Sequence, residues 1–138
     1  MGFPDILSFP LSHPGPYERN MGAMIVELLR LFHGRVPDAE SAAHVSELVM
    51  APARWSAAHE VFNELRRRCL IAIEAMDQVR AAQYAFEELC CTAMYNATSA
   101  DDPFDPSSPF FVAGAALRLA RAVDLPVEQI VAVLASTA

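Results

Sequence analysis

The chain contains no lysine, and all ten of its basic residues are arginine. Seventeen acidic residues give a net charge of −7, and the negative excess is spread along the sequence. An acidic surface repels phosphate backbones, so a nucleic-acid partner is disfavoured. The same charge suits a basic protein target.

Glycine is also scarce, with five residues and no cluster. Phosphate loops and nucleophile elbows need glycines at fixed spacing, and no such motif is present. We therefore expect no catalytic residue and no cofactor. The three cysteines cannot form a secreted disulfide framework, because their number is odd and two of them are adjacent.

Long apolar runs are missing too. No stretch is long enough to cross a bilayer, and the first residues lack the basic segment of a signal peptide. These absences predict a cytoplasmic protein with no membrane partner. A length of 138 residues predicts one domain, 1–138. The hydrophobic fraction of 54% is high for a small soluble protein and favours an oligomer that covers apolar surface.

Four prolines lie within residues 1–16 and prevent a continuous helix there. The same segment is too apolar for a solvated tail. We expect an extended, proline-rich arm that packs on the body of the protein or on a neighbouring subunit. The residues predicted to make this contact are Phe3, Ile6, Leu7 and Phe9.

The remaining residues, 17–138, have helical periodicity and no strand pattern. The predicted fold class is all-α, a compact helical bundle of five to six helices. Besides the central region, helices are predicted at about 17–33, 37–51, 109–123 and 127–136.

The central residues, 53–98, contain neither glycine nor proline and keep a seven-residue apolar repeat. This repeat predicts coiled-coil-like packing. The inward positions of the repeat include Trp55, Phe62, Leu65, Cys69, Ala72, Met76, Val79, Phe86, Cys90 and Ala93.

A single helix over residues 53–98 would be about 65 Å long, which is much longer than a compact domain of this size. Such a helix would protrude and pair with a second copy, and Trp55 and Phe62 are the candidate contacts. The alternative is two consecutive helices, with Asp77 capping the second. The absence of a strong breaker favours the single helix.

The sulfur-rich stretch at 86–97 reads FEELCCTAMYNA. Adjacent helical residues point about 100° apart, so Cys90 and Cys91 cannot face one metal ion. On the heptad grid Cys90 points inward and Cys91 to a neighbouring face. Glu87 and Glu88 are predicted to lie towards the flanks or solvent.

Other polar residues are weaker candidates for metal ligands. Metal sites in helical bundles usually contain Glu-x-x-His pairs, with the two residues at i, i+3. Glu40 and His44 are instead at i, i+4. The alternative interpretation is that the glutamates and histidines form a solvated polar face and that the cysteines are thiols in the core. The candidates are Glu40, His44, Glu47, His59, Glu60, Cys90 and Met94.

Arg66, Arg67 and Arg68 lie beside the heptad repeat, and Glu64 is close in sequence. A solvated and partly paired face is the favoured interpretation of these arginines.

Three functional hypotheses follow. The first is a non-enzymatic helical protein–protein interaction or regulatory module, a homodimer that binds protein through helix faces or the arm. The second is a small-ligand-binding or metal-binding helical bundle, with an enzyme as one form of it. The third is an acidic inhibitor or immunity-type protein that blocks a basic target.

Overall fold

The computed structural model describes residues 5, 7, 21–40, 55–98 and 109–137. These residues form five α-helices and no strand, which confirms the all-α class. The helices are α2 (Met21–His33), α4 (Trp55–Glu74), α5 (Gln78–Thr98), α6 (Pro109–Ala122) and α7 (Val127–Ser136).

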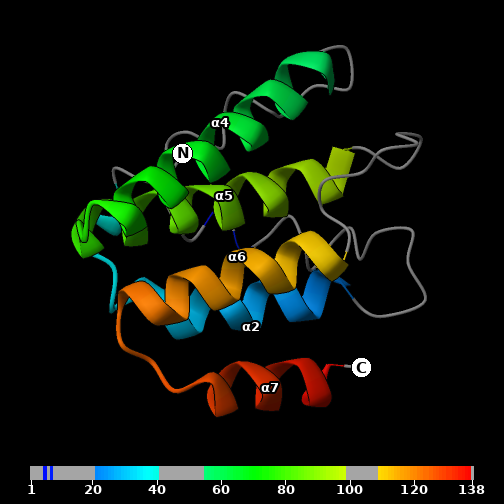
Figure 1. Ribbon diagram of the computed structural model, residues 1–138. Helices are drawn as coiled ribbons and strands as arrows, with labels where there is room; N and C mark the ends of the chain where they lie inside the picture. Colours follow the sequence, from blue (N-terminus) through cyan, green and yellow to red (C-terminus); the bar gives the residue numbers. More distant parts are fainter. Residues whose placement is uncertain (1–4, 6, 8–20, 41–54, 99–108, 138) are drawn as a thin grey trace.

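Helix α5 lies at the centre of the bundle, with α4 on one side and α2 and α6 on the other (Figure 1). Helix α7 packs against α2 and α6 at the far side from α4. Because α5 has neighbours on most of its circumference, every residue from 88 to 95 is buried. Within this stretch only Glu88 and Thr92 are polar, as is typical of the part of a helix that crosses a core.

The single long helix that the sequence favoured is wrong. The chain turns back at residues 75–77, so α4 and α5 form an antiparallel helical hairpin (Figure 1). The second alternative, two consecutive helices, is the one the structure has. A hairpin buries the apolar repeat within the chain, whereas a protruding helix would leave it exposed to water.

The turn combines a helix end and a helix start in three residues. Met76 has a left-handed backbone, with φ of 58°. The Asp77 N–H donates to the carbonyl of Ala72 at 2.8 Å, and the Met76 N–H donates to the carbonyl of Ile73 at 3.0 Å. These two bonds define a Schellman motif. The Asp77 carboxylate then accepts the N–H of Arg80 at 3.2 Å, which caps α5 as predicted.

The apolar repeat packs inside the hairpin on both sides of the turn. The buried members are Phe62, Leu65, Cys69, Ala72, Phe86, Cys90 and Ala93. Two other members, Met76 and Val79, are exposed because the chain reverses at that point. The repeat therefore predicts the packing surface correctly but not the reversal within it.

The remaining helices agree closely with the periodicity. Helix α2 buries the predicted apolar stripe, including Met24, Ile25 and Phe32. Of the helix predicted at 37–51, Ala39 and Glu40 are helical, and residues 41–51 lie outside the described residues. The predicted start at Pro37 is wrong, because Pro37 and Asp38 form a turn in which Asp38 has a left-handed backbone, with φ of 53°. Within the arm, Asp5 and Leu7 are described, and their backbone is helical rather than extended. Pro4 precedes them, and proline is compatible with a first helical turn.

Met76→Gly is predicted to stabilise the protein by about 0.5–1 kcal/mol, because glycine adopts a left-handed backbone without the steric cost of a side chain. The Met76 side chain is 88% exposed, so little packing is lost. Urea unfolding measures the change. Met76→Ala is the control, since it removes the same side chain but keeps the strain. Equal stabilities of the two variants would contradict this account of the turn.

Candidate functional site

The three consecutive arginines of α4 do not share one environment. Arg67 and Arg68 are exposed and both pair with Glu64, at 2.6 and 2.7 Å. Their guanidiniums lower the pKa of Glu64 to about 2, by hydrogen bonding first and charge second. This pairing confirms the expected solvated face for two of the three arginines. Arg66 points the other way, towards α5.

Glu88 of α5 lies between Arg66 of α4 and Arg118 of α6. Its carboxylate oxygens are 2.6 Å from Arg66 Nε and 2.8 Å from Arg118 Nη2. The Glu88 side chain is 2% exposed, so the prediction that it faces the flank or solvent is wrong. The physical reason is the central position of α5, which leaves no solvent side at residue 88. One buried carboxylate thus joins three helices.

This ionic cluster (Arg66, Glu88 and Arg118) carries more donors than acceptors. Arg66 Nη2 and Arg118 Nε are buried with no hydrogen-bond partner among the described residues, and the close Arg66 Nε–Glu88 Oε1 contact is an ion pair without hydrogen-bond geometry. The Arg66 guanidinium also lies 4.3 Å from the centre of the Phe111 ring, a cation–π distance. Burial raises the pKa of Glu88, whereas the two guanidiniums act in the opposite direction.

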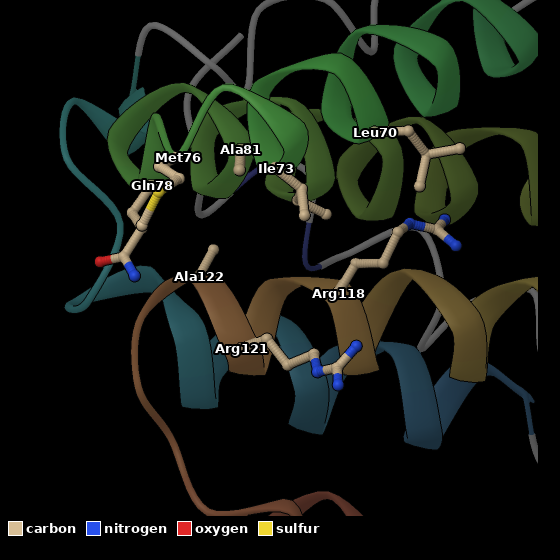
Figure 2. Close-up of a pocket in the computed structure, with 8 residues that line it drawn as sticks. All are labelled: Leu70, Ile73, Met76, Gln78, Ala81, Arg118, Arg121 and Ala122. Carbon is tan, nitrogen blue, oxygen red and sulfur yellow. The ribbon is translucent and has the colours of Figure 1, made fainter.

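A cleft of about 360 Å³ opens beside this cluster, between the α4–α5 hairpin and α6 (Figure 2). Its apolar lining is Leu70, Ile73, Met76, Ala81 and Ala122, and its polar lining is Gln78, Arg118 and Arg121. Arg118 projects from α6 towards the hairpin, whereas the Arg121 side chain runs along α6 at the edge of the cleft (Figure 2). A second hollow, on the other side of the hairpin, has only about 160 Å³.

The outer face of α4 is the second notable surface. Arg67, Leu70, Ile71 and Glu74 follow the i, i+3, i+4, i+7 spacing of one helical face. All four are exposed, with Leu70 at 53% and Ile71 at 51%. We call these four residues the α4 outer face. The buried residues of α4 point to α5, so this face is turned towards solvent, with Leu70 at the border of the cleft and Ile71 at the border of the smaller hollow.

The cysteines are core residues. All three are free and buried, and Cys91 is as fully enclosed as Cys90. Desolvation raises the pKa of both thiols, which removes the reactive thiolate at neutral pH. The heptad grid placed Cys91 on a face beside the packing seam. In the structure other helices cover that face of α5 as well, so Cys91 is buried.

The metal-ligand candidates are dispersed where they can be seen. Glu40 Oε1 contacts His33 Nε2 at 3.0 Å, and His59 Nε2 lies 3.3 Å from the Tyr95 hydroxyl. Glu60 is exposed, Cys90 and Met94 are in the core, and His44 and Glu47 lie outside the described residues. In the part of the chain described, no group of three His, Cys, Asp or Glu side chains is close enough to hold a metal ion.

The predicted contact residues also separate. Phe62 is fully buried and packs edge-on against Tyr95, with ring centres 5.6 Å apart. It therefore presents no surface in this structure. Leu7 is partly buried against the core. Phe3, Ile6 and Phe9 lie outside the described residues, and Trp55 is the first residue of α4.

Sequence reasoning missed the α4 outer face and the two arginines of the cleft. A signal was present: the stretch CLIAI at 69–73 is apolar at every position, although only Cys69 and Ala72 belong to the apolar repeat. A helix that is apolar on more faces than one partner can cover has a second contact to make. Arg118 and Arg121, at i, i+3 on α6, gave no such signal.

No protein-family model, curated protein or solved structure matches this chain. Across 21–40, 55–98 and 109–137, none of the helices is both long and apolar enough to span a membrane. The function must therefore be argued from the cluster, the cleft and the α4 outer face themselves.

Glu88→Gln is predicted to destabilise the protein by about 3 kcal/mol, because two buried guanidiniums lose their counter-charge. Glu64→Gln is the matched control. Glu64 also contacts two arginines, but at the surface, so its loss should change the free energy of unfolding much less than the loss of Glu88 does. Chemical denaturation of both variants tests the contrast, and equal effects would refute it.

Glu87 provides a pH-dependent test. Desolvation raises its pKa to about 7, against the opposing charge of Arg68. The folded state then binds a proton more tightly than the unfolded state, so Glu87 lowers stability progressively as pH rises from about 4.5 to about 7. Glu87→Gln should stabilise the protein at pH 8, on the order of 2 kcal/mol after allowance for partial hydration, and much less at pH 5. Urea titrations at both pH values measure this, and a pH-independent difference would contradict it.

Proposed function

We propose that this protein is a non-enzymatic helical interaction module that forms a homodimer through the α4 outer face. The observation that carries the proposal is the self-complementary order of Arg67, Leu70, Ile71 and Glu74 along one exposed face. A basic residue begins the face, two large apolar residues form its middle, and an acidic residue ends it.

Self-complementarity matters because a two-fold dimer brings the same surface of both copies together. If two α4 helices pack antiparallel about a point between residues 70 and 71, Leu70 of each copy meets Ile71 of the other. Arg67 then lies opposite Glu74, and the pair occurs twice. The apolar centre of the face would be buried in the interface, while the charged residues at its rim would fix the register of the two helices.

The position of α4 in the bundle supports this packing. Helix α4 forms one side of the bundle and packs chiefly against α5 (Figure 1). Its residues Glu60, Asn63, Arg67 and Ile71 are exposed. The exposed half-turns of α4 contain no proline or glycine to interrupt contact with another helix. This basis for a dimer differs from the apolar repeat, which α5 already covers.

The remaining features fit a regulatory or scaffolding role in a reducing compartment such as the cytoplasm. The three cysteines are free thiols held in the core. The acidic surface is compatible with a basic protein as a further partner, as in the inhibitor hypothesis. Among the described residues, no group of side chains favours metal binding.

The dimer is tested by sedimentation velocity from low to high micromolar concentration. We expect a concentration-dependent dimer for the native chain. Arg67→Glu and Glu74→Arg should each weaken association about tenfold, because each places like charges opposite one another. The double variant Arg67→Glu/Glu74→Arg should recover most of the association, since the pairs are restored with the signs exchanged.

Arg30→Glu is the control for net charge, because Arg30 is an exposed arginine on α2 that pairs with Glu27. It should leave association unchanged. A native chain that stays monomeric throughout the concentration range would overturn the proposal. A double variant as weak as either single variant would overturn the antiparallel arrangement.

A further inference from the structure

The cleft between the hairpin and α6 shares only Leu70 with the α4 outer face. Its volume of about 360 Å³ lies within the range of small-molecule sites, roughly 300–1,000 Å³. The hollow of about 160 Å³ on the other side of the hairpin is too small for such a ligand. Of these two hollows, only the cleft is large enough to hold a small-molecule ligand.

The lining of the cleft is divided into an apolar part and a cationic edge. Ile73, Met76 and Ala81 come from the hairpin, and Ala122 faces them from α6 (Figure 2). Arg118 and Arg121 are three residues apart on α6, so they share one face of that helix. Figure 2 shows both side chains beside the apolar lining.

The charges at this edge do not balance. Arg66 and Arg118 share the single carboxylate of Glu88. Arg121 is exposed and makes no ion pair among the described residues. Two guanidiniums, those of Arg118 and Arg121, thus line a cleft whose lining contains no carboxylate, in a protein whose overall charge is −7. An excess of positive charge beside an apolar cleft is complementary to an anion with an apolar tail.

We propose that the cleft binds a small amphipathic carboxylate, with its acyl chain on Ile73, Met76 and Ala122 and its carboxylate at Arg121 and Arg118. Arg121 supplies most of the recognition of the head group, because Arg118 is already engaged by Glu88. This site goes beyond the dimer: Leu70 borders both surfaces, but Arg67, Ile71 and Glu74 of the α4 outer face do not line the cleft.

Methyl NMR of the native chain tests the site, with decanoate as the probe. The chain has five isoleucines, and two of them lie on different sides of α4: Ile73 lines the cleft, whereas Ile71 lines the smaller hollow. We expect a saturable shift of the Ile73 methyl signal and of the Met76 methyl signal. The Ile71 signal should not follow the same titration curve.

Two further probes separate the contribution of the head group from that of the chain. Decanol has the same chain with a neutral head, and decylamine has a cationic head. We expect both to bind at least about fivefold more weakly than decanoate, as the loss of a charge-assisted contact predicts. Equal binding of the three probes would overturn the anionic specificity. No saturable shift at Ile73 with decanoate would overturn the site.

Variants then test the residues. Arg121→Gln should weaken decanoate binding about fivefold. Ala122→Phe should abolish it, because the larger ring occupies the apolar part of the cleft. Arg80→Gln is the matched control: it removes an exposed arginine that lines the smaller hollow and should leave binding unchanged. Equal weakening by Arg121→Gln and Arg80→Gln would show a general charge effect and overturn the proposal.

Sedimentation of the same variants keeps this proposal distinct from the dimer. Arg121→Gln and Ala122→Phe lie outside the α4 outer face, so their association should equal that of the native chain. Arg67→Glu should in turn leave decanoate binding unchanged. Each proposal can therefore fail while the other stands.

Discussion

The arrangement of the bundle depends on one buried carboxylate. Glu88 holds Arg66 of α4 and Arg118 of α6 from the central helix, so a single side chain sets the relative positions of three helices. Buried ion pairs add little net stability compared with apolar packing, but they tolerate few alternative geometries. The contact also constrains the rotation of α4, because Arg66 has to point to Glu88.

The turn at residues 75–77 is the second constraint. It folds one continuous apolar repeat on itself, and α4 and α5 then cover each other's inward positions. The residues that remain exposed on α4 are those that the repeat does not use. Both proposed surfaces follow from this: the α4 outer face on the far side, and the cleft where the tip of the hairpin meets α6 (Figure 2).

Periodicity predicted the helices at 109–122 and 127–136 almost to the residue, because proline marks the start of each. The break in the central helix was harder to predict, since Met76 adopts the left-handed conformation that glycine usually signals. Glu88 was misplaced because a heptad grid assumes one partner helix, whereas α5 has three. The cleft was beyond sequence reasoning, because Ile73 and Arg121 are brought together only by the packing of α6 on the hairpin.

The most direct test of the dimer is intermolecular disulfide formation by single cysteines placed on α4. Antiparallel packing puts the two copies of Ile71→Cys beside the two-fold axis, whereas two copies of Glu60→Cys would lie about 30 Å apart. The native cysteines do not interfere, because they are buried and their thiol pKa values are raised. Mild oxidation should yield a covalent dimer of Ile71→Cys and leave Glu60→Cys monomeric. Equal cross-linking at both positions, or none at residue 71, would contradict the proposed dimer.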